Sequence, residues 1–321
     1  MNHEELKQLW QISFDDSESY VNFYFSRRYR PENTRICLND GHVVSAAQFF
    51  PYDISYDGTI LKGVYILGVC THPDYRRRGF TAQLIREILI EQAANGIEVA
   101  FLIPSKQYLF EIYRKFGFAE LFVVYEENVK SASIGNYELM NPPSGEVFAF
   151  YNRFYRSLNS AVLKTYDDFI FAMEDTIISG GRVDICGING EIRGFAATEG
   201  RVVKELLCLD AAARDTLLTA LLLDVNGGGL TVMSPRLQPG VVKKIIGMAR
   251  VLHPAAFLVK TRKKRDTIHI SDSILTHNTG IYTIKSSGVE FDPNGRFDTA
   301  LDISELPAYG MKESYANLLL N

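Results

Sequence analysis

Three consecutive arginines followed by a glycine, Arg76, Arg77, Arg78 and Gly79, are the residues whose types and spacing most clearly predict chemistry. Guanidinium groups pair with phosphate oxygens through parallel hydrogen bonds, and a glycine lets the backbone come close to a ligand. A helix is expected directly after this turn, from apolar residues at helical spacing: Leu84, Ile85, Ile88, Leu89 and Ala93. The first N–H groups of a helix have no partner inside it and carry about half a positive charge. The turn and the helix start together predict a site for a diphosphate.

The elements around this turn predict a strand–turn–helix–strand unit. An apolar, β-prone run at residues 65–70 precedes the turn, and a second strand is expected at residues 99–103, after the helix stop Gly96. A short helix over residues 106–115 is then followed by a third strand that opens at residues 116–118. Neither the ATP-binding pattern G-x-x-x-x-G-K-[ST] nor the dinucleotide fingerprint G-x-G-x-x-G occurs. The alternative is a basic turn on an ordinary α/β protein.

Residues 69–79 resemble the acetyl-CoA-binding motif of the GCN5-related N-acetyltransferases, whose core pattern is [RQ]-x-x-G-x-[GA]. Arg76 and Gly79 fit this pattern, whereas Thr81 stands where the family has glycine or alanine. A second run, residues 113–118, matches the family element Y-x-x-x-G-F. The resemblance implies acetyl-CoA as co-substrate. The cofactor-binding residues that it implies are Val69, Cys70, Thr71, Arg76, Arg77, Arg78, Gly79, Phe80 and Thr81.

Transfer of an acetyl group to an amine sets three chemical requirements. Deprotonating an amine of pKa near 10.4 at neutral pH costs about 4–5 kcal/mol, so a proton acceptor is needed. The oxyanion formed at the thioester carbonyl needs hydrogen-bond donors, for which backbone N–H groups at a bulged strand end over residues 69–71 are candidates. The departing thiolate needs a proton donor, and the resemblance places Tyr113 in that role. The alternative for Tyr113 is a core aromatic on an amphipathic helix.

Residues 25–34, 48–52 and 68–73 resemble one subgroup, the enhanced-intracellular-survival type of acetyltransferase. In this subgroup the C-terminal carboxylate of the chain acts as the base, which here would be that of Asn321; the alternative is a frayed terminus. Glu126 and Glu127 are weaker candidates. The subgroup plan implies a catalytic domain, a second acetyltransferase-like domain without the cofactor loop, and a shortened domain like a sterol carrier protein. The expected bounds of these three domains are 1–138, 139–258 and 259–321.

The expected fold class is α+β, with tandem acyl-CoA N-acyltransferase domains whose mixed, mostly antiparallel sheets are flanked by helices, and a small α+β C-terminal domain. Residues 136–147 are expected to be a linker, residues 251–259 a strand, and the region around Tyr315 a last helix. The second half repeats the order helix, hairpin, strand, helix, strand. Its turn at residues 210–215 lacks glycine and carries two carboxylates, which predicts a scaffold domain without cofactor rather than a second active site.

Composition excludes several function classes. A net charge of −4 gives no reason to expect nucleic acid, and no apolar run is long enough to span a membrane. The histidines show no ligand spacing, so no metal is expected. The scattered cysteines Cys37, Cys70, Cys186 and Cys208 predict reduced core residues, and the polar start of the chain is unlike a secretory signal, so a cytoplasmic protein is expected.

The function expected from these features is acetyl-CoA-dependent N-acetylation of a primary amine, either a small molecule or lysine. The alternative is a non-catalytic acyl-CoA-binding or regulatory protein with the same fold, and a carrier function of the C-terminal segment is a third reading. The subgroup forms closed assemblies, so a homo-oligomer is an open option. An aromatic group near the N-terminus either lines an acceptor pocket or forms core; it consists of Trp10, Phe14, Tyr20, Phe23, Tyr24, Phe25 and Tyr29.

Overall fold

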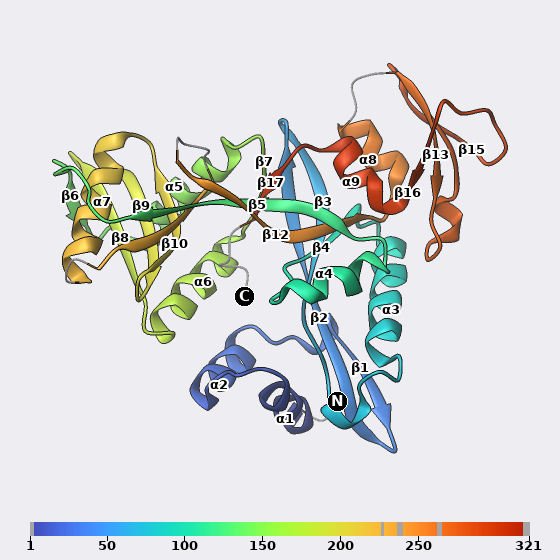
Figure 1. The fold of residues 1–321 in the computed structure, drawn as a ribbon, viewed down its shortest axis with the longest axis horizontal. Helices are drawn as coiled ribbons and strands as arrows, with labels where there is room; N and C mark the ends of the chain where they lie inside the picture. The colour runs from blue at the N-terminus through green and yellow to red at the C-terminus, as the bar shows by residue number, and fades with distance from the viewer. Residues whose placement is uncertain (1–2, 226–227, 236–239, 262–264, 317–321) are drawn as a thin grey trace. The chain divides into compact units, whose positions relative to one another are not determined.

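The computed structural model describes residues 3–225, 228–235, 240–261 and 265–316 (Figure 1). The chain forms two compact units, and neither is one continuous stretch of sequence. The first unit joins Met1–Leu121 to Gly247–Glu313, and the second joins Phe122–Ile246 to Ser314–Asn321. The three-domain division at residues 138 and 258 stays a prediction.

Two helices open the first unit, α1 (His3–Ser13) and α2 (Glu18–Arg27), followed by the short η1 (Pro31–Asn33). Ser17 caps α2, because its hydroxyl accepts a hydrogen bond from the Tyr20 N–H at 3.2 Å. Trp10 stacks on Tyr24 with ring centroids 4.6 Å apart, and both rings are buried. The core interpretation of the aromatic group therefore holds for its buried members, Trp10, Tyr24, Phe25 and Tyr29.

The main sheet of the first unit contains β1 (Thr34–Asn39), β2 (His42–Tyr56), β3 (Thr59–Thr71), β4 (Val99–Leu102) and the end of β12 (Val242–Val251). Pairings are antiparallel except between β3 and β4, which are parallel. A hairpin turn at Asp40 and Gly41 joins β1 to β2, and both residues have positive φ. The β-prone run predicted at residues 65–70 is the second half of one long strand, β3, which already begins at Thr59.

Helix α3 (Phe80–Ala94) buries against this sheet the apolar residues that predicted it, Leu84, Ile85, Ile88, Leu89 and Ala93. Helix α4 (Gln107–Arg114) follows β4 as predicted. The third strand was placed too early: residues 116–118 form a turn, and β5 (Ala119–Val129) begins after it. The reason is Gly117, whose φ of +76° is a turn conformation and not an extended one.

The C-terminal part of the first unit begins with a helix where a strand was expected. Residues 254–261 form α8 (Pro254–Thr261), which a proline opens and whose buried residues Phe257, Leu258 and Thr261 lie at helical spacing. A small sheet of order β15-β14-β13-β16 follows. Its elements are β13 (Asp266–Ser271), η3 (Thr276–Asn278), β14 (Gly280–Lys285), β15 (Gly288–Asp292), β16 (Thr299–Asp302), η4 (Ile303–Glu305) and α9 (Leu306–Gly310).

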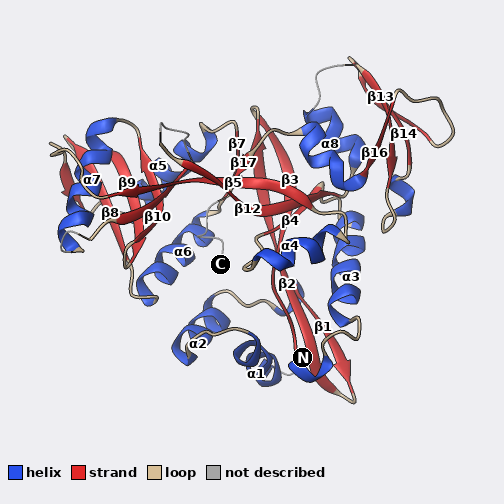
Figure 2. Cartoon of the chain, viewed as in Figure 1, coloured by secondary structure: helices blue, strands red, loops and turns tan. Residues whose placement is uncertain are grey.

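The strands of the second unit follow the order β7-β17-β5-β11-β10-β9-β8-β6, and helices lie against them (Figure 2). Its elements besides β5 are β6 (Glu138–Met140), α5 (Ser144–Arg156), β7 (Ser160–Leu163), α6 (Tyr166–Ile178), β8 (Arg182–Ile188), β9 (Glu191–Glu199), β10 (Val202–Cys208), α7 (Ala211–Asp224), β11 (Leu230–Ser234) and β17 (Ser314–Tyr315). The run β8-β9-β10-α7-β11 repeats the order β1-β2-β3-α3-β4, as the sequence predicts.

Two expectations for the second unit are wrong. Residues 136–147 are no linker, because β6 pairs with β8 and α5 begins at Ser144. Tyr315 lies in β17, which pairs in parallel with β5 and β7, and not in a last helix. Its side chain is buried, and the hydroxyl donates to Glu205 Oε1 at 3.3 Å. Glu205 also accepts from the hydroxyls of Tyr151 and Tyr155, so β17 is tied to a buried carboxylate.

Candidate active site

A bulge interrupts β3 shortly before the basic turn. The partners of β2 change from Ala46 with Cys70 to Gln48 with Leu67, which leaves one extra residue on β3. Gly68 sits in this bulge with a φ of +59°, and a Cβ there would lie 2.7 Å from Trp10 Cζ3. A glycine inside a strand pattern is the sequence signal for such a bulge. Gly68 is therefore a residue that shapes the site and that sequence analysis did not include among the site residues.

The edge of β3 that follows this bulge lies open. Pairing between β3 and β4 ends where Tyr65 meets Phe101, and β4 itself ends at Leu102, although β3 continues to Thr71. In the described part of the chain, no strand pairs with this edge of β3 after Tyr65. An extended ligand can bind along a strand edge of this kind in the manner of an added strand.

The basic turn continues from this edge through η2 (Pro73–Tyr75) to the start of α3. Gly79 is the N-cap of α3 with a φ of +91°, and nothing lies within 4 Å of the position a Cβ would take. Gly79 carries no side chain that could cap α3, so the N–H groups of the first turn stay available to a ligand. An open glycine before an uncapped helix start is the geometry that an anion needs.

The three arginines of the turn are exposed, and within the described ranges none of them is in an ion pair. Arg76 Nε donates to the Thr71 carbonyl at 3.1 Å. Arg78 donates to the Asp74 carbonyl at 3.0 Å and its guanidinium lies 5.0 Å from the centre of the Tyr75 ring. These contacts hold the side chains near the turn and leave their charges for an anion.

Thr81, which departs from the family pattern, fits into a hydroxyl chain that joins the helix start to the strand end. The Thr81 and Thr71 hydroxyls lie 2.9 Å apart, and the Thr71 and Ser45 hydroxyls 2.7 Å apart. Ser45 also donates to the Cys70 carbonyl at 2.8 Å. Ser45 was missed from the sequence because it lies on β2, which carries no part of the motif.

Cys70 is buried at the end of β3. Burial raises the pKa of its thiol to about 12, although the Arg76 charge acts in the opposite direction. The group therefore stays a neutral thiol at physiological pH and is a poor nucleophile. All four cysteines are free, and three of them, Cys37, Cys70 and Cys186, are buried, which agrees with reduced core residues.

Tyr113 lies near the end of α4 and is 8% exposed. Its ring meets the Phe118 ring edge-on at a centroid distance of 6.0 Å. Burial raises the pKa of the Tyr113 hydroxyl to about 12. The residue thus belongs to the core and also stays protonated, as a proton donor must, so its catalytic role stays a prediction.

Of the candidate bases, the structure describes the two glutamates but not the C-terminal residue. Asn321 lies outside the described residues, as do Leu318, Leu319 and Leu320. Glu126 and Glu127 lie on β5 in the second unit.

Both glutamates of β5 are in ion pairs: Glu126 accepts from Lys244 Nζ and Glu127 from Arg214 Nη2, each at 2.5 Å. Each of these two carboxylates therefore already has a cationic partner within the second unit.

The turn of the second unit that corresponds to the basic turn has the opposite character. Asp210 caps α7 by accepting from the Ala213 N–H at 2.9 Å, and Arg193 pairs with it at 2.7 Å. Partial burial raises the pKa of this carboxyl, but the bonds from Ala213 and Arg193 outweigh it and hold the pKa below the usual value. A cleft of about 350 Å³ opens beside this helix start, with Glu127, Asp210, Arg214 and Asp215 among its lining residues. The absence of a cofactor here stays a prediction.

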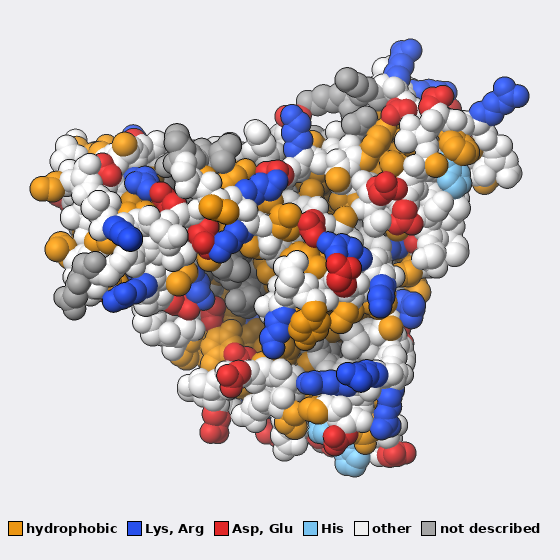
Figure 3. All heavy atoms as spheres, in the orientation of Figure 1, with side chains coloured by type: hydrophobic (Ala, Val, Ile, Leu, Met, Phe, Trp, Pro, Cys, Tyr) orange, Lys and Arg blue, Asp and Glu red, His pale blue; other side chains and the backbone are white. Residues whose placement is uncertain are grey.

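Two further findings concern the described residues as a group. They contain no cluster of histidine, cysteine, aspartate or glutamate suited to a metal ion. Among their helices, none is both long and apolar enough to cross a membrane. On the face drawn in Figure 3, basic and acidic side chains are interspersed.

Comparison with known proteins decides the class of the domain that carries the basic turn. Residues 2–121 match the family profile described as acetyltransferase (GNAT) domain. This stretch is a GNAT domain. The protein is accordingly an acyltransferase, and GNAT domains in general use acetyl-CoA. The matched residues include the bulge in β3, the turn at Arg76–Gly79 and the element from Tyr113 to Phe118.

Solved structures share the fold of nearly the whole acyltransferase chain. A probable N-acyltransferase from Enterococcus faecalis V583 is 14% identical with a TM-score of 0.75, covering 98% of this chain and 95% of its own. Eis1 from Mycobacterium abscessus is 15% identical with a TM-score of 0.75, covering 96% and 87%. A GCN5-related N-acetyltransferase from Anabaena variabilis is 18% identical with a TM-score of 0.74, covering 95% and 85%. At these identities the likeness shows the fold alone. No curated protein sequence matches the chain.

Proposed function

We propose that this acyltransferase moves an acetyl group from acetyl-CoA to a primary amine, either on a small molecule or on a lysine side chain. The observation that carries the proposal is the continuity of three features: the open edge of β3, the arginine turn, and the uncapped start of α3. An extended amide chain that ends in a diphosphate is complementary to such an edge followed by such a turn.

The cofactor residues have separate tasks in this proposal. The N–H groups at Phe80 and Thr81 bind the diphosphate, and the charges of Arg76, Arg77 and Arg78 neutralise it. The backbone of residues 69–71 pairs with the pantetheine amides and gives donors to the thioester carbonyl. Gly79 leaves room for the phosphates, because a side chain there would occupy the open space in front of the helix.

Transfer proceeds by direct attack of the amine on the thioester carbon. The amine first loses a proton to a base, for which the terminal carboxylate of Asn321 is the candidate. The new C–N bond forms a tetrahedral intermediate with a negative oxygen and a positively charged nitrogen. The C–S bond then breaks, Tyr113 gives its proton to the departing thiolate, and the nitrogen loses its second proton, which restores the Tyr113 hydroxyl and leaves the neutral amide. The protonated state of Cys70 argues against an acyl-cysteine intermediate, since a neutral thiol of such high pKa attacks a thioester slowly.

The finer architecture is also part of the proposal. Tandem acetyltransferase-type domains at residues 1–138 and 139–258, and a shortened sterol-carrier-like segment at 259–321, would place the chain in the enhanced-intracellular-survival subgroup. The repeated element order of the second unit and the shared fold with Eis1 from Mycobacterium abscessus support this assignment. A homo-oligomer and a cytoplasmic location go with it.

Calorimetry with acetyl-CoA and with acetyl-pantetheine, which lacks the diphosphate, tests the cofactor assignment. We expect acetyl-CoA to bind and acetyl-pantetheine to bind far more weakly, because only the former reaches the turn. A thiol-release assay over a panel of primary amines then tests transfer. Equal affinity for the two thioesters, or no binding of either, would remove the basis of the proposal. Binding without release of thiol for any amine would favour a regulatory acyl-CoA-binding role.

A further inference from the structure

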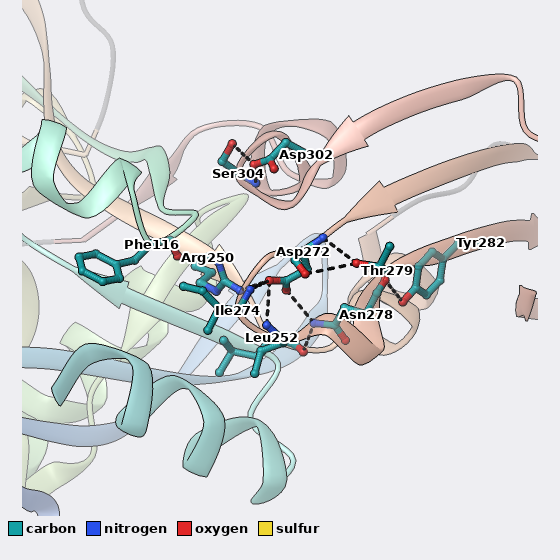
Figure 4. Close-up of polar contacts among 11 residues, drawn as sticks. Phe116, Arg250, Leu252, Asp272, Ile274, Asn278, Thr279, Tyr282, Asp302 and Ser304 are labelled. Atoms are coloured by element: carbon teal, nitrogen blue, oxygen red, sulfur yellow. Dashed lines mark hydrogen bonds and ion pairs between the residues drawn. The ribbon is translucent and has the colours of Figure 1, made fainter. Parts of the chain in front are cut away.

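A fully buried ion pair lies directly behind the turn that follows α4. Arg250 on β12 is 1% exposed, and its Nη2 donates to Asp272 Oδ1 at 2.6 Å. Its Nη1 donates to the carbonyl oxygen of Phe116 at 2.5 Å (Figure 4). One guanidinium therefore links the family element at residues 113–118 to a carboxylate that is 22 positions from Arg250 and farther still from Phe116 in sequence. No local sequence pattern predicts this link.

Asp272 is held rigidly on its own side of the ion pair. Its Oδ1 accepts from the N–H groups of Ile274 at 3.0 Å and Leu275 at 2.9 Å, and its Oδ2 accepts from Asn278 Nδ2 at 3.1 Å. Its own N–H donates to the Thr279 hydroxyl at 3.0 Å, so the carboxylate and its backbone are both fixed (Figure 4). These bonds satisfy the Asp272 carboxylate, as a buried charge requires, whereas the Arg250 Nε has no hydrogen-bond partner among the described residues. Asp272 thus gives Arg250 a fixed orientation.

Gly117 is shaped to receive the guanidinium. A Cβ at this position would lie 2.0 Å from Arg250 Nη1 and 2.8 Å from Ile303 Cγ2, and the φ of +76° is itself unfavourable for other residues. The Y-x-x-x-G-F element therefore needs a glycine at this position in this protein, because Arg250 occupies the space that a side chain would take. Any side chain there would displace Arg250.

The Phe116 carbonyl that Arg250 binds lies in the turn directly after Tyr113. The Phe116 N–H donates to the Tyr113 carbonyl at 2.9 Å, and the Gly117 N–H donates to the Arg114 carbonyl at 2.9 Å. These bonds close the last turn of α4. Arg250 holds the C-terminal end of this turn through its hydrogen bond to the Phe116 carbonyl. A shift of the Phe116 carbonyl would therefore move the backbone that carries Tyr113.

We propose that Arg250, oriented by Asp272, is a positioning residue for Tyr113, and that the C-terminal part of the first unit supports acyl transfer through this contact. The inference rests on the proposed function, in which Tyr113 is the proton donor. Misplacement of a reacting group by about 1 Å can lower a rate by about a hundredfold. Loss of the hydrogen bond to Phe116 should accordingly lower kcat while cofactor binding at the arginine turn is retained.

A double-mutant cycle between Arg250 and Tyr113 tests this. Arg250→Lys keeps the charge opposite Asp272 but loses the planar guanidinium that binds both Asp272 and the Phe116 carbonyl. We expect this change to lower kcat by about 10- to 100-fold with KM for acetyl-CoA little changed. In a Tyr113→Phe background the same change should leave kcat unaltered, because the residue it positions no longer donates a proton. Arg182→Lys, which alters the ion pair of Arg182 with Asp184 in the second unit, is the matched control and should leave kcat as it is.

A second variant covers the case in which Arg250→Lys does not fold. Replacing both partners, Arg250→Met with Asp272→Asn, removes the two buried charges together and keeps an amide oxygen for the Ile274 and Leu275 N–H groups that Asp272 binds. Amide hydrogen exchange at Gly117 and Phe118 then reports the loosened turn without using activity. We expect faster exchange there and the same loss of kcat.

The outcomes separate the two proposals. If Tyr113→Phe lowers kcat but Arg250→Lys lowers it equally in both backgrounds, or not at all, the positioning role is wrong and the proposed function stands. If Tyr113→Phe leaves kcat unchanged, the assigned proton donor is wrong and the positioning role falls with it. If exchange at Gly117 and Phe118 is unaltered in the folded double variant, Arg250 does not hold the turn.

Discussion

At the scale of single residues, the arginine turn and Tyr113 could be named from sequence because the motif that contains them is local. Arg250 and Asp272 could not, since Arg250 is 134 positions from Phe116 in the chain. A lone arginine in an apolar strand pattern gives no hint of what it binds. The contact becomes visible only when the fold brings β12 behind the turn after α4.

Gly117→Ala should strongly destabilise the protein. The added methyl would overlap Arg250 Nη1 and also force an unfavourable backbone, for a loss of about 3 kcal/mol or more in the free energy of unfolding. Gly41→Ala is the matched control, because its φ of +85° is similar but nothing lies within 4 Å of the new methyl. Its cost should be about 1 kcal/mol. Equal losses for the two variants in urea denaturation would show that the guanidinium contact does not matter.

The raised pKa of Tyr113 predicts how stability depends on alkaline pH. The unfolded chain releases this proton near pH 10 and the folded chain near pH 12, so between these values the folded state binds more protons. Stability is then fully present below pH 10 and falls as pH rises toward 12, by up to about 1.4 kcal/mol per pH unit from this group.

The measurement is the free energy of unfolding at pH 9 and pH 11, for wild type and Tyr113→Phe. The variant should show a shallower decline, since it lacks one of the groups that titrate. An identical decline in both proteins would mean that the Tyr113 hydroxyl is not buried as described.

At the scale of elements, periodicity predicted most helices and strands, and the failures have distinct physical causes. The apolar run after Val251 is compatible with a strand, but Pro254 opens a helix there and tertiary burial selects the helical face. Residues 136–147 have the composition of a linker, yet three of them add β6 to the edge of a sheet. Edge strands of that length carry too little pattern to be recognised.

The arginine turn, as an element, should control affinity for the diphosphate and not for the rest of the cofactor. We expect Arg77→Gln to weaken acetyl-CoA binding by about tenfold, because one charge-assisted bond to phosphate is lost. Binding of acetyl-pantetheine should be unaffected by the same change.

Arg156→Gln, on an exposed position of α5, serves as the control for the loss of one positive charge and should bind both thioesters as wild type does. A parallel loss for acetyl-CoA in both variants would point to a general charge effect. In that case the turn would not be the phosphate site.

At the scale of the whole molecule, the sequence predicted the repeat of element order but not which segments of the chain make up each unit. Which distant segments share one core depends on pairings such as β12 with β4 and β17 with β5, whose partners are far apart in the chain. The sequence of a short strand or of an apolar helix does not indicate which distant element it will pack against. Tyr315, expected in a helix, is a strand residue because β5 and β7 flank it.

Two truncations distinguish the structural and chemical roles of the chain end. Deletion of residues 314–321 removes β17, leaves β5 and β7 without their shared partner, and takes one hydroxyl donor from buried Glu205. We expect a loss of at least about 3 kcal/mol in the free energy of unfolding.

Deletion of residues 317–321 alone keeps β17. If the Asn321 carboxylate is the base, kcat should fall most at low pH, where free amine is scarce. Full activity at all pH values in this shorter deletion would exclude the terminal carboxylate.

The interleaving of the two units has a consequence for how the protein is made. The first 121 residues leave the ribosome with their arginine turn complete but without β12, Arg250 and Asp272. These belong to the same unit and are synthesised only after the intervening second unit. During that interval β4 lacks one neighbour and the turn after α4 lacks its anchor. Nascent chains halted before residue 250 should therefore be sensitive to protease and bound by chaperones, and they should become resistant once translation has passed residue 313.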